Sequence, residues 1–220
     1  EILRARTDFL DAFSNSSNTE LQARALYGLG RTYFLERDYY AAIDAFNRVI
    51  GQYQTSEYAA FSYYLLGQTY IEIEEFQQAI NAFNQFIVFY PDQINAFVYQ
   101  EIGDISLSIE NFDQAIINYQ NALLAEPENN PQYLNLQIGK AYAGLDDHTT
   151  AIQYFNSVYD AAQDEYTRST ANLLSGQSYI ELGLNNDAYT KFLDSVIKYP
   201  KAFDSFTALT ILVNDGVPVD

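Results

Sequence analysis

Apolar residues recur along the chain every three or four positions, and the pattern returns from one segment to the next. Leu26, Leu29 and Tyr33 are spaced in this way. The following segment continues the pattern at Ile43, Phe46, Val49 and Ile50. Residues three or four apart share one face of a helix, so each segment predicts an amphipathic helix with one buried stripe.

Small residues and rings mark the same points of five successive segments. Glycines recur every 36 or 37 residues, at Gly30, Gly67, Gly103, Gly139 and Gly176. Twelve residues after each glycine stands an alanine, at Ala42, Ala79, Ala115, Ala151 and Ala188. Four residues later comes a ring, at Phe46, Phe83, Tyr119, Phe155 and Phe192. The period predicts stacked helix pairs whose backbones approach closely at the small residues while the ring fills the adjacent space.

Short polar segments predict where the two helices of each pair meet. They lie at residues 36–38, 74–75, 110–111, 146–147 and 185–186. Pro91, Pro127 and Pro200 follow three of the second helices, at points where a helix cannot easily continue.

This pattern resembles the tetratricopeptide repeat (TPR), whose signature places leucine-glycine, tyrosine, alanine, phenylalanine and proline within about 34 residues. The second segment matches best, through Leu66, Gly67, Tyr70, Ala79, Phe83 and Pro91. The glycine-to-alanine interval is constant, so we expect the extra residues to lie between repeats. The resemblance implies an all-α, right-handed superhelical solenoid of antiparallel helix pairs.

The register predicts a single solenoid over residues 1–220, with five full repeats and a half repeat at each end. The full repeats cover 23–54, 60–91, 96–127, 132–163 and 169–200; residues 1–17 form a lone second helix and 202–214 a lone first helix. The end helices carry apolar stripes at Leu3, Phe9, Leu10 and Phe13 and at Phe206, Leu209, Leu212 and Val213. Because solenoid ends normally need a cap, we expect self-association through an end, or a tail that covers it.

The family resemblance also indicates where a ligand binds, because first helices of TPR arrays line a concave face. The candidate ligand-binding residues on that face are Tyr27, Arg31, Phe34, Phe61, Tyr64, Gln68, Phe97, Gln100, Asp104, Tyr133, Lys140 and Gln177. Rings and amides predominate, which favours an extended, largely uncharged peptide or protein segment. The alternative is that many of these rings only pack adjacent repeats together.

One ligand class is excluded by the same positions. TPR domains that clamp a carboxylate terminus use lysine, arginine and asparagine on successive first helices to supply charge-assisted hydrogen bonds. Here Arg31 is followed at the matching positions by Gln68 and Asp104, and Lys140 stands alone. An acidic peptide terminus would therefore find no such clamp.

Charge excludes further partners. The 220 residues include 29 acidic and 11 basic side chains, a net charge of −18 at pH 7. Such a chain repels nucleic acid and anionic lipid, and no apolar run approaches the roughly 18 residues of a membrane-spanning helix. Residues 49–139 carry eleven carboxylates and no lysine or arginine. This stretch is either a solvated acidic surface, or a surface that attracts a basic partner or repels anionic cell-wall polymers.

No catalytic residue, metal site or cofactor site is predicted, so we expect a non-enzymatic chain. Cysteine is absent, and the one histidine, His148, lies in a turn without further ligands or a nucleophile in a suitable context. Asp147 or Thr149 is expected to cap the helix that starts there. The glycines occur once per repeat and are not clustered as in a phosphate-binding loop.

Two narrower resemblances keep alternatives open. Residues 199–220 are similar to a stretch of some bacterial lytic transglycosylases. That implies an accessory region that contacts peptidoglycan in the bacterial cell envelope, with the catalytic domain downstream. Residues 79–91 resemble repeats of outer-membrane assembly lipoproteins, which implies an envelope assembly factor. The first hypothesis remains a scaffold that binds a protein or peptide.

Overall fold

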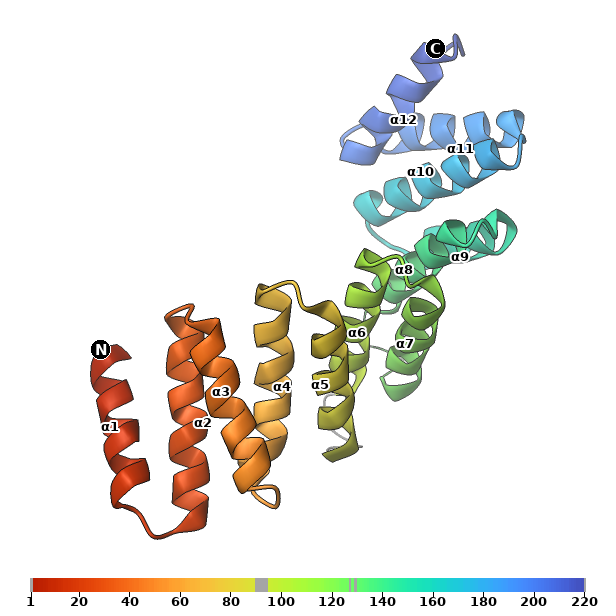
Figure 1. Cartoon of the computed structure of the whole chain (residues 1–220). Helices are drawn as coiled ribbons and strands as arrows, with labels where there is room; N and C mark the ends of the chain where they lie inside the picture. Colours follow the sequence, from red (N-terminus) through yellow and green to blue (C-terminus); the bar gives the residue numbers. More distant parts are fainter. Residues whose placement is uncertain (1, 90–94, 127, 129, 220) are drawn as a thin grey trace. The chain divides into compact units, whose positions relative to one another are not determined.

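The computed structural model describes residues 2–89, 95–126, 128 and 130–219, with side chains from Arg4 onward. Within these residues every regular element is an α-helix and none is a strand (Figure 1), which confirms the all-α prediction. The chain divides into two compact units, residues 1–98 and 99–220, and the division falls within α6 (Asn95–Ser108).

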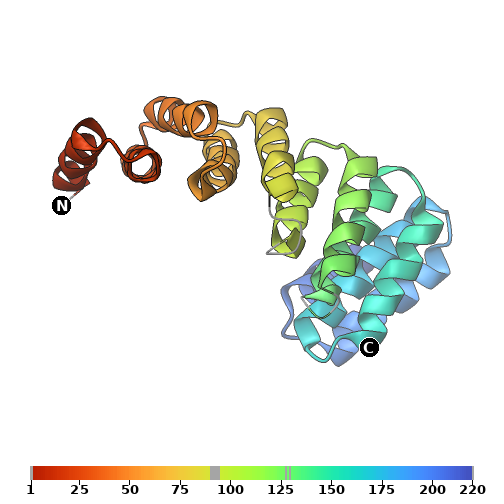
Figure 2. The ribbon, with the colours of Figure 1, turned by 90° about the horizontal axis from the view of Figure 1, so that it is seen from below.

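Unit 1 is a row of antiparallel helices. They are α1 (Ile2–Asn15), α2 (Thr19–Leu35), α3 (Tyr39–Gln52), α4 (Glu57–Glu72) and α5 (Phe76–Phe89). Each helix packs on the next one in the chain, and the order is easy to follow from below (Figure 2). The first helices α2 and α4 also touch each other directly. Each helix pair is therefore held both internally and against its neighbour, as in a stacked repeat.

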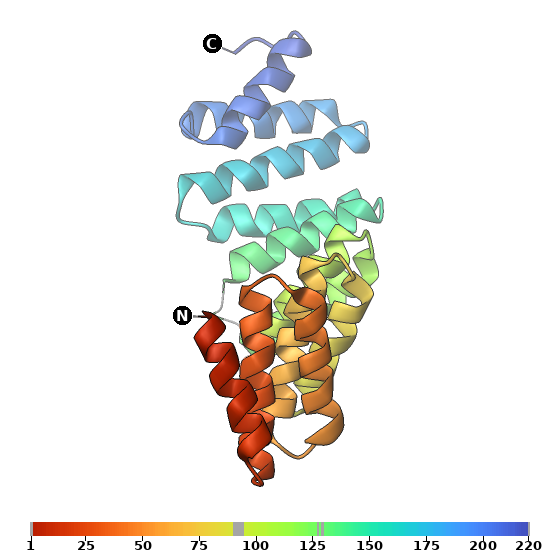
Figure 3. The same ribbon diagram turned by 60° about the vertical axis from the view of Figure 1, so that its left-hand side comes forward.

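Unit 2 continues with the same type of pair. Its further helices are α7 (Phe112–Ala125), α8 (Pro131–Gly144), α9 (His148–Ala161), α10 (Glu165–Glu181), α11 (Asn185–Lys198) and α12 (Phe203–Asn214). Sequential helices pack together from α7 to α12, and α10 also contacts the first helices α8 and α12. In Figure 3, α9, α10 and α11 lie one above another as successive layers.

The repeat core is the predicted contact between a first-helix glycine and a second-helix ring. The five pairs are Gly30 with Phe46, Gly67 with Phe83, Gly103 with Tyr119, Gly139 with Phe155 and Gly176 with Phe192. A Cβ atom on any of these glycines would lie less than 3.0 Å from the ring. The five repeat alanines are completely buried. The sequence prediction of close backbone approach beside a filling ring is confirmed.

Every full-repeat first helix ends in a left-handed residue at the same position. These residues are Arg37, Glu74, Glu110, Asp146 and Gly183, with φ between 58° and 72°. The next backbone N–H donates back into the last helical turn, as Glu75 does to the Tyr70 carbonyl at 2.9 Å. This geometry satisfies a carbonyl that the helix leaves unpaired. Only the fifth repeat uses glycine, the residue that tolerates positive φ without strain.

The fifth turn corrects one sequence interpretation. Asn185 and Asn186 were expected between two helices, but they are the first residues of α11. The chain turns at residues 182–184 instead, because Gly183 takes the left-handed conformation. The prolines Pro91 and Pro127 lie outside the described residues, whereas Pro200 follows closely after α11, which ends at Lys198.

Parts of the apolar stripes of both end helices are covered within the chain. Phe9 and Phe13 of α1 pack against the cluster of Ala23, Leu26 and Leu29, and the side chain of Leu3 lies outside the described residues. Leu212 of α12 is completely buried, and the valines of the following tail, Val217 and Val219, pack against the same cluster, as the tail alternative of the sequence prediction expects. Phe206 remains 68% exposed and Val213 62% exposed. Self-association through these ends and a single 1–220 solenoid remain predictions.

Candidate functional site

In unit 1, the predicted ligand-binding rings pack largely on neighbouring rings. Tyr27 of α2 lies 5.4 Å from Tyr58 and 6.2 Å from Phe61, both on α4, measured between ring centroids. The Arg31 guanidinium lies 5.8 Å from the Tyr27 centroid. Burial raises the pKa of the Tyr27 hydroxyl, and the charge of Arg31 offsets part of that shift. These contacts join α2 to α4. The alternative that the rings pack adjacent repeats together therefore accounts for much of what these candidate residues do.

The remaining unit 1 candidates have a similar character. The Tyr64 ring lies 5.7 Å from Phe83 and 5.5 Å from Phe86, both on α5. Phe34 meets Tyr39 edge-on with centroids 5.9 Å apart. Gln68 is half-buried, whereas Phe97, on the part of α6 that belongs to unit 1, is 42% exposed.

In unit 2, Asp104 joins three helices through its carboxylate. One oxygen accepts hydrogen bonds from Tyr119 of α7 at 2.8 Å and from Tyr133 of α8 at 2.7 Å. Burial and the Asp104 hydrogen bond raise the pKa of Tyr133 to about 12. Both factors also raise the pKa of Tyr119. The Asp104 carboxylate is thus engaged within the fold, and Gln100, one turn earlier on α6, is half-buried.

Lys140 and Gln177, predicted on successive first helices, line one pocket of about 150 Å³ between α8 and α10. Its other lining residues are Ala143, His148, Phe155, Leu174, Ser178 and Glu181. The pocket exists because residue 143 is small. The equivalent position in the other repeats holds Phe34, Ile71, Leu107 and Ile180. The sequence analysis predicted Lys140 and Gln177 as ligand-binding residues but missed the pocket. The alanine at a position where the other repeats have a large side chain could have indicated it.

His148 lies at the edge of this pocket, at the start of α9. Asp147 caps that helix, and its carboxylate accepts a hydrogen bond from the Thr150 backbone N–H at 3.0 Å, which confirms the predicted capping role. The hydrogen bonds from Thr150 hold the pKa of Asp147 below its ordinary value. The Nδ1 atom of His148 is buried and has no hydrogen-bond partner among the described residues.

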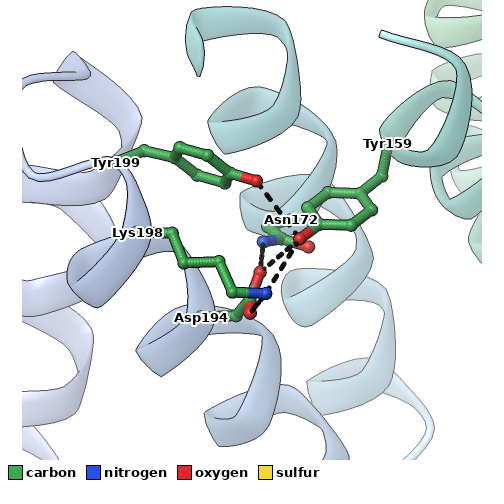
Figure 4. Close-up of polar contacts among 5 residues, drawn as sticks. All are labelled: Tyr159, Asn172, Asp194, Lys198 and Tyr199. Atoms are coloured by element: carbon green, nitrogen blue, oxygen red, sulfur yellow. Dashed lines mark hydrogen bonds and ion pairs between the residues drawn. The ribbon is translucent and has the colours of Figure 1, made fainter. Parts of the chain in front are cut away.

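A second polar site, missed by the sequence analysis, crosses α9, α10 and α11 (Figure 4). Asp194 of α11 accepts hydrogen bonds from Tyr159 at 2.7 Å and Asn172 at 2.9 Å, and pairs with Lys198 at 2.5 Å. Tyr199 donates to the Tyr159 hydroxyl oxygen at 3.2 Å. Burial raises the pKa of Tyr159, and the hydrogen bonds with Tyr199 and Asp194 raise it further.

A comparison of equivalent repeat positions would have revealed this network. Asn172 replaces Leu26 of the first repeat, and Tyr159 replaces the aliphatic Ile50, Ile87 and Leu123. Ser169 and Ser195 likewise replace apolar residues such as Ala23 and Val49, and their hydroxyls lie 2.8 Å apart in the core. The interior of the fifth repeat is therefore more polar than that of the first.

Two further properties bear on function. Among the described residues, no cluster of three or more histidine, aspartate or glutamate side chains is arranged to hold a metal ion. No described helix combines the length and apolar character that crossing a membrane requires.

Solved structures similar to this chain share its fold. YrrB, a TPR protein with an unusual peptide-binding site, aligns over 94% of this chain and 100% of its own, with 16% identity and a TM-score of 0.68. A MamA protein aligns over 90% and 93%, with 19% identity and a TM-score of 0.63. MamA from Desulfovibrio magneticus RS-1 aligns over 79% and 93%, with 14% identity and a TM-score of 0.62. No curated protein matches the chain by sequence.

Family models match three parts of the chain. Two models described as tetratricopeptide repeat match residues 21–87 and 133–165, and the SHNi-TPR model matches residues 96–124. Together the matches span more than half of the 220 residues. Repeats of this type are typically non-catalytic interaction scaffolds. The chain belongs to the tetratricopeptide repeat family of protein-interaction repeats.

Proposed function

We propose that this chain binds an extended peptide segment of a partner protein, and that one apolar side chain of the peptide enters the pocket between α8 and α10. The observation that carries this proposal is the convergence of Lys140 and Gln177, from successive first helices, on one pocket.

The chemistry of the pocket suits a side chain of a largely uncharged peptide. Ala143, Leu174 and Phe155 supply apolar surface, and Lys140, Gln177 and Glu181 supply polar groups that can bond to a peptide backbone. Its volume of about 150 Å³ equals that of about five water molecules. That is enough for one side chain but below the roughly 300–1,000 Å³ of pockets that enclose a whole small ligand.

The proposal also includes the other predicted first-helix residues, which would contact further parts of the peptide. The exposed parts of Arg31, Phe61, Tyr64 and Gln68 offer contact surface within unit 1. Because the rings of Tyr27 and Tyr64 already pack on neighbouring rings, they have less open face to stack on a sugar. We therefore favour a peptide over peptidoglycan as the ligand. The peptide-binding site of YrrB, a protein with the same fold, supports this ligand class.

The test is selection of peptides from a random phage-displayed library on the immobilised protein. We expect enriched peptides that share an apolar residue at one position. The Ala143→Leu variant should fill the pocket and weaken binding of those peptides about tenfold or more, since losing one buried apolar side chain costs about 1.5–3 kcal/mol. Leucine already stands at the equivalent position 107, so the variant should fold.

The matched control is Gln153→Ala, which alters an exposed residue of α9 outside the pocket. It should leave the affinity of the selected peptides unchanged. Absence of any enriched peptide, or equal affinity of wild type and Ala143→Leu for the enriched ones, would refute the proposal.

A further inference from the structure

Basic residues are unevenly distributed in unit 2. Five are present, and three of them, Arg168, Lys191 and Lys198, surround the side chain of Tyr159. The Arg168 guanidinium carbon lies 5.9 Å and the Lys191 Nζ 5.5 Å from the Tyr159 ring centroid. The Lys198 Nζ lies 3.4 Å from the Tyr159 hydroxyl oxygen. We refer to Arg168, Lys191 and Lys198 as the cation cluster.

The carboxylate of this site neutralises only one of the three cations. Asp194 pairs with Lys198, and the hydrogen bonds from Tyr159 and Asn172 occupy it further. Over the described part of the chain, neither Arg168 nor Lys191 lies within ion-pair distance of a carboxylate. Arg168 and Lys191 thus have no ion-pair partner among the described residues, although the charges of Asp194 and Asp160 act on Lys191 from a longer distance.

Both unpaired cations keep hydrogen-bond donors for a ligand. Lys191 donates one bond, to the Asn156 side-chain oxygen at 2.6 Å, and an ammonium group has three donors. The Arg168 Nε donates to the Ala162 carbonyl at 2.8 Å, which leaves the terminal nitrogens of the guanidinium. The fork of a guanidinium matches the geometry of a carboxylate.

Packing of the repeat does not require a lysine here. The position of Lys191 holds Ala45 and Ala82 in two other repeats, and both alanines are buried. The half-buried Lys191 ammonium has lost part of its hydration, which is unfavourable unless an anion or other polar group compensates for it. An anionic group from outside the chain would therefore complete the site.

We propose that the cation cluster around Tyr159 binds a carboxylate-rich segment of a partner protein. It lies on the second helices α9 and α11 and at the start of α10, and it shares no residue with the lining of the α8–α10 pocket. The Arg168 fork and the Lys191 ammonium would hold the glutamate or aspartate side chains, and Tyr159 would contact their aliphatic carbons. Nucleic acid is the weaker candidate, because the net charge of −18 repels a long polyanion more strongly than a short acidic segment.

The test uses a fluorescein-labelled peptide of alternating glutamate and glycine, with fluorescence anisotropy at low and at physiological salt. We expect saturable binding that weakens with salt, because both partners are charged. Lys191→Met and Arg168→Gln should each reduce affinity about tenfold, the effect of one charge-assisted hydrogen bond. The affinity of the wild-type protein for the glutamine–glycine analogue should be no higher than the affinity of the variants for the acidic peptide.

Arg48→Gln is the matched control, since it removes a half-buried arginine that belongs neither to the cluster nor to the peptide pocket. It should leave binding of the acidic peptide unchanged, and circular dichroism should show that all variants are folded. The proposal fails if the acidic peptide does not bind at low salt, if Lys191→Met and Arg168→Gln bind it like wild type, or if Arg48→Gln weakens binding equally. It also fails if sedimentation shows that the cluster mediates salt-dependent pairing of two copies, or if labelled single-stranded DNA binds the cluster more tightly than the peptide.

Discussion

The ring of Phe83 lies against the backbone of Gly67, so that a Cβ atom on Gly67 would be 2.6 Å from Cε1 of Phe83. Phe83 is completely buried and sits on the second helix of the same repeat. Carbon atoms at van der Waals contact are about 3.5–4.0 Å apart, so no side chain fits at residue 67 unless the ring moves. This contact determines how closely α4 and α5 approach.

Replacing Gly67 by alanine should therefore destabilise the protein although alanine favours helices. Overpacking of a tight core costs about 1–3 kcal/mol, which exceeds the gain of about 1 kcal/mol in helix propensity. The free energy of unfolding of Gly67→Ala, obtained from urea denaturation, should fall accordingly.

Gly51→Ala is the matched control. Gly51 is also helical, in the last turn of α3, but nothing is within 4 Å of a Cβ placed there. Its replacement should stabilise the protein by about 0.5–1 kcal/mol through helix propensity alone. If both variants were stabilised, the glycine-to-ring contact would not limit helix packing.

The fold was predictable from sequence because such contacts recur at fixed spacing. Gly67, Ala79 and Phe83 belong to one packing contact between two helices, and every full repeat forms this contact with similar residues. The course of the fifth turn was not predictable in the same way. Asn185 and Asn186 have the composition of a turn, yet Gly183, two residues earlier, is the residue that takes positive φ.

The candidate sites were only partly predictable, for a related reason. The position of Lys140 could be predicted from the helical face on which it lies. The pocket beside it depends on the absence of a large side chain at Ala143. The burial of Leu212 depends on tail residues that have no counterpart in the repeat pattern. Contacts formed by departures from the repeat, such as Tyr159 with Asp194, require the three-dimensional arrangement of three helices.

The left-handed turn residues give a second prediction. Glu74 has φ of 61° and follows directly after the C-cap of α4. For a residue with a side chain, the left-handed conformation costs about 1–2 kcal/mol. We expect Glu74→Gly to raise the free energy of unfolding by about 0.5–1 kcal/mol, the strain relief minus the entropy that glycine loses on folding. Urea denaturation measures the change.

The reverse replacement tests the same geometry. Gly183 has φ of 72° at the equivalent turn, so Gly183→Ala should destabilise by about 1 kcal/mol. Glu75→Gly, one residue after Glu74, introduces a glycine where φ is not positive and should give no gain. A stabilisation by Glu75→Gly as large as that by Glu74→Gly would contradict the strain argument.

The Asp194 network predicts a specific dependence of stability on pH. Burial raises the pKa of Asp194, but hydrogen bonds from Lys198, Tyr159 and Asn172 outweigh burial and hold the pKa below its ordinary value. A carboxyl whose pKa is lower in the folded state stabilises the fold above its unfolded pKa of about 3.9. This contribution is lost as the pH falls through the lower, folded pKa.

Thermal unfolding of wild type and Asp194→Asn at a series of pH values measures this contribution. Wild type should be the more stable protein at neutral pH, and the difference in Tm should shrink as the pH falls below about 4. Asp160→Asn is the control, since Asp160 is exposed and lacks this network. A Tm difference between wild type and Asp194→Asn that stays constant down to low pH would rule out the linkage.

Lys191 leads to a prediction about stability without any ligand. Burial lowers its pKa, and the charges of Asp194 and Asp160 offset only part of this effect. At neutral pH the charged lysine therefore destabilises the folded state. Lys191→Met keeps the length of the side chain and removes the charge, and Asn156 keeps a hydrogen bond from Ser175 at 3.4 Å.

We expect Lys191→Met to raise the free energy of unfolding by about 0.5 kcal/mol, a modest gain because solvent screens a half-buried charge. The gain should shrink at alkaline pH, where the wild-type lysine loses its proton in the folded state first. Urea denaturation at neutral and alkaline pH measures both values. A variant less stable than wild type at neutral pH would show that Lys191 is retained for the fold, which would remove the main reason to assign it to a partner's carboxylates.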